Sequence, residues 1–124
     1  NELNKTNILI KKINKKETTI FRPPGGHYDT NILKLVKKNK LKTVLWSING
    51  SDFTHNTTIS KPKKKASIKE TISNKVINNA KNGSIILLHN GGAQTISELP
   101  FIIEKLHEKG LKFVTISELL ENDV

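Results

Sequence analysis

Two polar runs, far apart in the chain, carry the residues best suited to catalysis. Residues 21–26 read Phe-Arg-Pro-Pro-Gly-Gly, and residues 87–92 read Leu-Leu-His-Asn-Gly-Gly. Each run follows an apolar segment with strand character and precedes a segment with helix character. Arg22 is the single arginine among many lysines, and its planar, permanently charged guanidinium offers a fork of donors that lysine lacks. We interpret the two runs as two walls of one active site.

Apolar residues at helical spacing predict four helices and a short fifth. The first covers residues 3–13, the second is capped by Asp29 or Thr30, and Gly83 stops the third. The Thr-Ile-Ser-Glu run at 95–98 has the pattern of a capping box that opens the fourth helix, which Gly110 closes, and Ser117 caps the fifth. The inner faces are predicted to be Ile32, Leu33, Leu35 and Val36; Ile68, Ile72, Val76 and Ala80; and Leu99, Ile102, Ile103 and Leu106.

Four apolar segments, at residues 18–21, 43–48, 84–88 and 112–116, alternate with these helices and are predicted to be strands. Strands that alternate with helices indicate an α/β fold with a parallel sheet. In such sheets, functional residues gather at the carboxyl ends of the strands. The polar runs that begin at Arg22, Asn49 and His89 each follow a strand, so we expect all three on one rim.

Length and composition limit the classes of protein that need be considered. The 124 residues suffice for one domain with a two-layer core but are few for a complete α/β barrel. No apolar stretch approaches the length of a membrane span. The absence of cysteine excludes disulfides and thiolate metal sites, and the absence of methionine predicts that Asn1 is not a translation start and that the segment comes from something longer.

The net charge of +10 raises the possibility of an anionic partner. However, the lysines are spread along the chain together with many asparagines and isoleucines, and the one dense cluster, at residues 61–65, falls in a predicted loop. Binding to single-stranded nucleic acid or RNA usually combines basic residues with stacking aromatic residues, which are few here. We therefore expect no specific nucleic-acid partner, and a basic nucleic-acid-binding module is the least favoured reading.

Three polar runs lie at 21–26, at 45–53 (Leu-Trp-Ser-Ile-Asn-Gly-Ser-Asp-Phe) and at 86–92. They are followed by Thr-Ile-Ser-Glu-Leu-Pro at 95–100 and by a closing segment at 112–120. In this order and spacing, these segments resemble the later motifs of the NodB-homology polysaccharide deacetylases, carbohydrate esterase family four. The resemblance covers nearly the whole chain. It implies the C-terminal portion of a distorted (β/α) barrel, with residues 1–124 forming a single partial domain. The family's first two motifs, which supply an Asp and two His as metal ligands, are absent from this sequence.

The resemblance also implies roles for residues of the first run. Arg22 would pair with a base aspartate that the chain itself does not contain. Pro23 and Pro24 would fix the turn, so that the backbone amide of Gly25 can face the oxyanion of the reaction. The family usually has Tyr at the position of Gly25, and the change keeps the amide while removing a ring from the cleft. Pro24 and Gly25 are thus candidate substrate-binding residues.

The later runs supply the other candidate residues. His89 would be the general acid that protonates the leaving sugar amine, a task that suits an imidazole. Asp52 would orient and charge that histidine. Phe53, where the family usually has Trp, would form an apolar wall of the groove, and Leu87 would line the pocket for the acetyl methyl group.

Two asparagines, Asn49 and Asn90, occupy positions where the family commonly has aspartate. Both keep hydrogen-bonding capacity and lose charge, which bears on the tuning of His89 more than on the fold. These two asparagines and the missing metal motifs make a catalytically inactive, sugar-binding remnant of the same fold the alternative function.

The activity that the resemblance implies is metal-dependent hydrolysis of the N-acetyl group of peptidoglycan or chitin-like glycans, at an extracellular or cell-surface location. A divalent metal such as zinc is expected for the full-length domain, whereas the sequence contains no set of ligands for it. The isolated chain is expected to be inactive and to bind no stoichiometric zinc. Its expected partners are an N-acetylated glycan and either the missing N-terminal half of the domain or a second copy, because part of a barrel leaves sheet edges uncovered.

Overall fold

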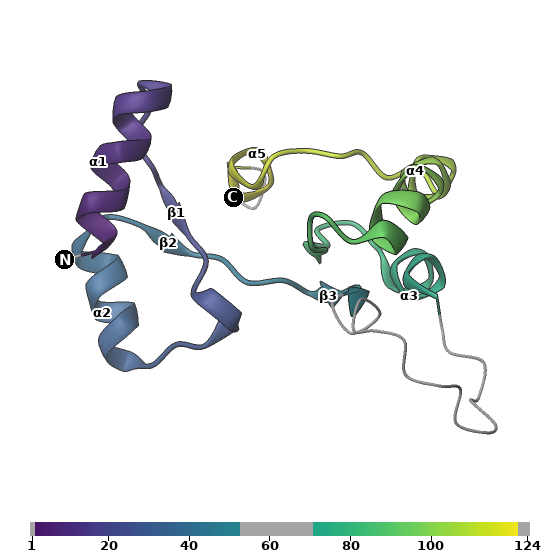
Figure 1. Ribbon diagram of the computed structural model, residues 1–124, viewed down its shortest axis with the longest axis horizontal. Helices are drawn as coiled ribbons and strands as arrows, with labels where there is room; N and C mark the ends of the chain where they lie inside the picture. Colours follow the sequence, from purple (N-terminus) through teal and green to yellow (C-terminus); the bar gives the residue numbers. More distant parts are fainter. Residues whose placement is uncertain (1, 53–70, 122–124) are drawn as a thin grey trace. The chain divides into compact units, whose positions relative to one another are not determined.

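The computed structural model describes residues 2–52 and 71–121, and its contacts divide the chain into two units, residues 1–45 and 46–124 (Figure 1). Helices and short parallel strands alternate in both units, which confirms the predicted α/β class. The strands form two separate pairs, β1 with β2 and β3 with β4. Each helix in the described part of the chain falls short of the length and apolar character that a bilayer crossing requires.

The first unit contains α1 (Glu2–Asn14), β1 (Ile20–Phe21), a 3-10 turn η1 (Pro24–Gly26), α2 (Thr30–Lys38) and β2 (Lys42–Thr43). Helix α2 begins where the Asp29 carboxylate accepts a hydrogen bond from the backbone N–H of Ile32 at 2.8 Å, so Asp29 is the cap. The parallel β1–β2 pair aligns Ile20 with Lys42 and Phe21 with Thr43.

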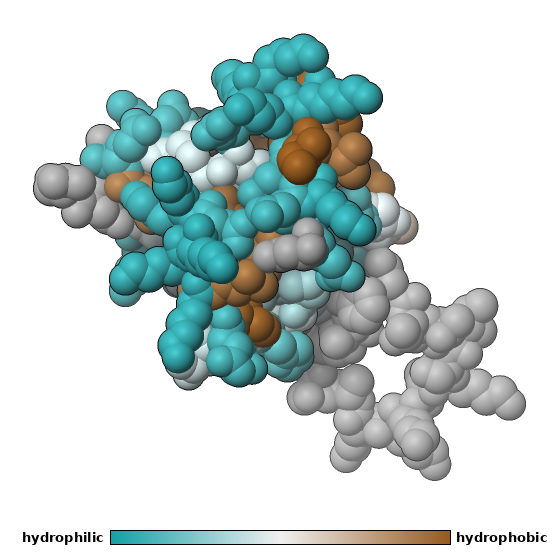
Figure 2. Space-filling view, turned by 90° about the vertical axis from the view of Figure 1, so that its left-hand side faces the viewer, coloured by the Kyte–Doolittle hydropathy of each residue, from teal (hydrophilic) through white to brown (hydrophobic). Residues whose placement is uncertain are grey.

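The helices of this unit are less buried than their apolar patterns predict. In α2 only Val36 is buried, and the predicted inward residues Leu33 and Leu35 are 40% and 37% exposed. Helix α1 has no buried residue, and its Ile13 is 82% exposed. Figure 2, which faces the left-hand side of the view in Figure 1, shows apolar patches among the hydrophilic side chains. Periodicity thus located these helices, but within this unit their apolar faces stay largely exposed.

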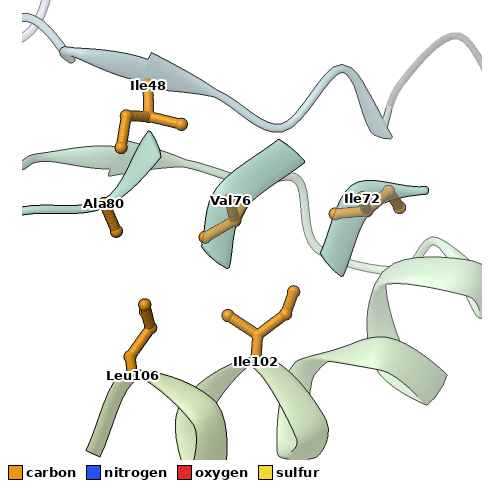
Figure 3. Close-up of a cluster of buried hydrophobic side chains, with 6 residues drawn as sticks. All are labelled: Ile48, Ile72, Val76, Ala80, Ile102 and Leu106. Carbon is orange, nitrogen blue, oxygen red and sulfur yellow. The ribbon is translucent and has the colours of Figure 1, made fainter. Parts of the chain in front are cut away.

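The second unit contains β3 (Ile48–Asn49), α3 (Ile72–Asn79), β4 (Ile86–Leu87), α4 (Ala93–Glu108) and α5 (Ile116–Glu121). The parallel β3–β4 pair aligns Ile48 with Ile86 and Asn49 with Leu87. Its core is one cluster in which a strand residue and the facing sides of α3 and α4 meet (Figure 3). The cluster consists of Ile48, Ile72, Val76, Ala80, Ile102 and Leu106. The predicted inner faces of both helices are confirmed at these helical positions, whereas Leu99 and Ile103 are each 38% exposed.

The predicted strand at 43–48 is wrong in extent, because its two ends pair with different partners. The backbone N–H of Val44 donates to Phe21 O at 2.9 Å, whereas that of Ser47 donates to Ile85 O at 2.9 Å. Residues 44–47 therefore connect β2 to β3 without belonging to either strand.

The predicted strand at 112–116 is also wrong. Residues 111–115 adopt no regular structure, and Phe113 and Val114 are 51% and 49% exposed. The segment borders a cavity of about 600 Å³ that β4 and α4 also line, through residues such as Ile86 and Ile102. A strand pattern forms a strand only when an edge pairs with it, and here this segment has no such pairing.

The tetrapeptide Thr-Ile-Ser-Glu occurs twice, at 95–98 and 115–118, and adopts two different roles. At the second occurrence, Glu118 accepts from the Thr115 backbone N–H at 2.7 Å, and the Glu118 N–H donates to Thr115 Oγ1 at 3.3 Å, which is a capping box before α5. Thr115 rather than Ser117 is thus the capping residue. At the first occurrence the predicted capping box is wrong, since α4 already begins at Ala93 with Gly92 as its cap.

Candidate active site

The short loop after β3 delivers Asp52 to the carboxyl end of the β3–β4 pair. Gly50 extends the pairing by donating its backbone N–H to Leu87 O at 3.0 Å. The Asn49 side chain then accepts from the Ser51 backbone N–H at 2.8 Å, and Ser51 has a positive φ of 56°. This tight turn places Asp52 in the interior, where the residue is 1% exposed.

Gly50 allows close packing in this loop. A Cβ added there would lie 2.4 Å from Leu88 Cδ2 and 3.3 Å from Leu87 O. The Leu88 methyl group ends a flexible side chain and can shift, whereas Leu87 O is backbone of β4 and would have to give by a few tenths of an ångström. A glycine at this position therefore lets the loop that carries Asp52 lie directly against β4.

His89 follows β4 and meets Asp52 through two hydrogen bonds. The His89 ring nitrogen Nδ1 lies 2.8 Å from Asp52 Oδ1, and the His89 backbone N–H donates to Asp52 Oδ2 at 2.6 Å. The Asp52 side chain is fully buried, whereas that of His89 is 43% exposed. The pair thus has a buried carboxylate behind a solvent-facing imidazole, which is the arrangement that an orienting carboxylate and a proton-transferring histidine require.

Thr95 completes the environment of Asp52 and was not a candidate from the sequence. Its hydroxyl is buried and donates to Asp52 Oδ2 at 2.8 Å. In the sequence, the Thr-Ile-Ser-Glu pattern pointed to helix capping and hid this contact. The useful signal would have been the early start of α4 at the Gly91-Gly92 turn, which places Thr95 inside the helix and leaves its hydroxyl available to a neighbouring loop.

These contacts set the charge state of Asp52. Burial acts to raise the pKa of Asp52, but the hydrogen bonds from the His89 ring, the His89 backbone and Thr95 outweigh it, so the pKa lies below its ordinary value. An ionised carboxylate only accepts hydrogen bonds, so His89 Nδ1 carries the proton that faces Asp52. The neutral ring therefore has its proton on Nδ1, and Nε2 is the nitrogen that takes up or releases a further proton.

The run that begins at Arg22 lies in the first unit, between β1 and α2. Pro23 is buried, and Arg22, Pro24 and Gly25 are exposed. The turn is closed by the Gly26 backbone N–H, which donates to Pro23 O at 2.9 Å. The convergence of this run with Asp52 and His89, and the pairing of Arg22 with an aspartate, remain predictions.

Gly25 has a conformational reason to be glycine. Its φ of 62° lies in the left-handed region, which costs other residues roughly 1 kcal/mol or more, and an added Cβ would lie 3.0 Å from the His27 ring. This local geometry accounts for a residue without a side chain where the family usually has Tyr. The proposed use of its amide toward an oxyanion stays a prediction.

The two apolar candidates differ in what the structure says of them. Leu87 is buried in β4, 8% exposed, and lies two positions before His89. Its predicted contact with an acetyl methyl group remains a prediction. Phe53 lies outside the described residues.

A metal centre does not fit the described residues. Within residues 2–52 and 71–121, no group of three or more His, Cys, Asp or Glu side chains could hold a metal ion. Both carboxylate oxygens of Asp52 accept hydrogen bonds from the protein. A cation at Asp52 would compete with these donors.

Comparisons with known proteins identify the family of the chain. Residues 1–44 match the family model described as polysaccharide deacetylase. A peptidoglycan-N-acetylglucosamine deacetylase of Bacillus cereus is 40% identical over 109 residues, which cover 85% of this chain and 46% of that protein. The chain belongs to the NodB-homology polysaccharide deacetylases, carbohydrate esterase family four.

Solved structures show the same fold. The peptidoglycan deacetylase PdaC of Bacillus subtilis superimposes with a TM-score of 0.74 at 29% identity, covering 95% of this chain and 52% of that one. A carbohydrate esterase family four pseudoenzyme from Bacillus anthracis superimposes with a TM-score of 0.77 at 26% identity, covering 95% and 38%. The architecture therefore corresponds to part of a distorted (β/α) barrel, and the chain spans about half the length of the Bacillus cereus relative and of the PdaC chain in its solved structure.

Proposed function

We propose that the protein to which this chain belongs removes N-acetyl groups from a glycan, with peptidoglycan as the substrate. The observation that carries the proposal is the buried Asp52 carboxylate that holds His89 Nδ1 at 2.8 Å. The names of the relatives support it, since the Bacillus cereus protein is a peptidoglycan-N-acetylglucosamine deacetylase and the Bacillus subtilis protein a peptidoglycan deacetylase. Chitin-like glycans are a second substrate class, and the family implies an extracellular or cell-surface location.

We assign the proton transfer of this reaction to His89, and its contact with the buried Asp52 carboxylate supports this assignment. Water adds to the acetamide carbonyl, and the C–N bond of the resulting tetrahedral intermediate must then break. The sugar amine leaves as a neutral group only if its nitrogen gains a proton. The His89 imidazolium supplies that proton from Nε2, while the ionised Asp52 stabilises the imidazolium and fixes its orientation. The products are acetate and a free amino sugar.

Family resemblance implies a divalent metal that activates the water, and the described residues do not hold one. The roles proposed for this chain are therefore confined to orientation and proton transfer. Hydrolysis of an amide requires an activated nucleophile as well, so residues 1–124 alone are expected to release no acetate and to bind no stoichiometric zinc.

The test uses the full-length gene product and an N-acetylated peptidoglycan fragment, with acetate release as the readout. The wild-type protein should release acetate, and His89→Ala should lose a factor of roughly 10² to 10⁴ in turnover, the range for a general acid. His107→Ala is the matched control, because it removes an exposed histidine that contacts Phe113 instead of a carboxylate. Glycan binding without acetate release would favour the inactive sugar-binding remnant, for which Asn49 and Asn90 are the motivation. Full turnover in His89→Ala would refute the assignment of the acid.

A further inference from the structure

Thr95 contacts the Asp52 carboxylate from a different element than His89 does. The hydroxyl donates to Oδ2 at 2.8 Å from the first turn of α4, although the two residues are 43 positions apart. Thr95 is 6% exposed and Asp52 is 1% exposed, so water does not readily replace this bond. A buried hydrogen bond to a charged group is among the stronger interactions in a protein.

The three hydrogen bonds divide between the two carboxylate oxygens. Oδ1 accepts from the ring of His89, whereas Oδ2 accepts from the His89 backbone and from Thr95. Rotation of a carboxylate about its Cβ–Cγ bond is soft, because this torsion has broad minima. A third donor, on a separate helix, fixes the plane of the carboxylate independently of where the His89 ring lies.

We propose that Thr95 is a positioning residue for proton transfer: its hydroxyl fixes the Asp52 carboxylate so that Oδ1 stays in the plane of the His89 ring and holds the Nδ1–H tautomer. This role rests on the function proposed above for His89, because the tautomer leaves Nε2 as the nitrogen that exchanges a proton with the substrate. Nothing in the motif pattern assigns Thr95 such a role, since that pattern marks it as a helix cap.

The first test needs no activity and uses the chain itself, labelled with ¹⁵N. Long-range ¹H–¹⁵N spectra of neutral His89 report the tautomer ratio. The wild type and Thr95→Ser, which keeps the hydroxyl, should show the Nδ1–H form. Thr95→Val, which keeps the shape and removes the donor, should lower the ratio of Nδ1–H to Nε2–H roughly tenfold. An unchanged ratio in Thr95→Val would overturn the proposal.

Two controls separate positioning from folding. Thr115→Val alters the same tetrapeptide in its exposed capping box and should leave the His89 spectrum unchanged. If Thr95→Val does not fold, Thr95→Ala removes the same donor with a smaller side chain. A change of tautomer in Thr115→Val equal to that in Thr95→Val would assign the effect to general loosening and overturn the proposal.

The second test uses the full-length protein and acetate release. Thr95→Val should lower kcat roughly tenfold or more with KM nearly unchanged, and Thr95→Ser should restore most of it. If the wild type releases no acetate while Thr95→Val still changes the tautomer, the proposed function fails and the positioning role stands. If the tautomer does not change, the positioning role fails whatever the activity.

Discussion

Replacing Glu98 by alanine should destabilise the second unit strongly, because Glu98 joins α4 to the beginning of α3. Its Oε2 accepts from the Ser73 backbone N–H at 2.7 Å and from the Ser73 hydroxyl at 2.6 Å. Ser73 is 5% exposed and lies in the first turn of α3, where backbone N–H groups have no partner within the helix. The alanine variant leaves both Ser73 donors buried and without their acceptor.

The expected loss is about 2–4 kcal/mol of unfolding free energy. A hydrogen bond to a charged group contributes about 1.5–3 kcal/mol net. The two bonds share one oxygen and Glu98 is only half-buried, so the total falls below the sum of two such bonds. Glu98→Gln keeps a carbonyl acceptor for Ser73 and should lose less.

The sequence provides a matched control in Glu118. It ends the second Thr-Ile-Ser-Glu tetrapeptide, yet the hydrogen bonds it accepts from Thr115 are local and lie at an exposed helix end. Urea unfolding, followed by the fluorescence of the single tryptophan, Trp46, and by far-ultraviolet circular dichroism, measures both variants. Glu118→Ala should cost much less than Glu98→Ala. Equal losses would mean that the tetrapeptide acts locally in both places, and the argument from the Ser73 contact would be refuted.

Three further predictions concern single sites. Asp52→Asn should shift neutral His89 toward the Nε2–H tautomer, because an amide N–H at the position of Oδ1 donates to Nδ1. Since the Asp52 pKa is lowered, the stabilisation by the ionised carboxylate is present above its ordinary value of 3.8 and is lost as the pH falls through the lowered value. In urea unfolding, the difference in unfolding free energy between the wild type and Asp52→Asn should therefore narrow below about pH 4, and a constant difference would contradict this. Val76→Ala should cost about 2–3 kcal/mol in urea unfolding, because Val76 is fully buried between α3 and α4, and a loss below about 1 kcal/mol would show that the cluster collapses around the gap. Lys40→Gly should stabilise the first unit by up to about 1 kcal/mol in thermal unfolding, because Lys40 has a φ of 57° just after α2, and destabilisation would show that the lysine side chain contributes more than the strain costs.

The sequence predicted the class of fold and the elements on which the second unit depends. The period of apolar residues identified α3 and α4, and their buried positions Val76 and Ile102 match the prediction. Such predictions succeed because a helix that packs against a neighbour within the same unit must be apolar on that side. In α1 the pattern has the same form, but no residue of the helix is buried, and Ile13 is 82% exposed.

Errors arose where a short pattern has two physical outcomes. Residues 112–116 have the composition of a strand, yet strand formation depends on a partner edge, which composition does not encode. Thr95 and Thr115 precede the same three residues, but only Thr115 caps a helix. The difference is set upstream, where the glycine pair at 91–92 starts α4 early and moves Thr95 from the helix end into its first turn. A local motif therefore predicts structure only when its register relative to the helix start is known.

The candidate site shows why Asn49 is compatible with an intact Asp52–His89 pair. The atom of Asn49 that the turn uses is Oδ1, which accepts from Ser51 and which an aspartate would present equally well. The negative charge that an aspartate would add at position 49 has no part in the three hydrogen bonds to Asp52, all of which come from His89 and Thr95. Asp52 is buried and Asn49 is exposed, so a charge at position 49 would be screened by solvent while that of Asp52 acts directly on the ring. Orientation of His89 thus depends on residues that this chain retains, and the replacement of aspartate at position 49 is by itself weak evidence for an inactive remnant.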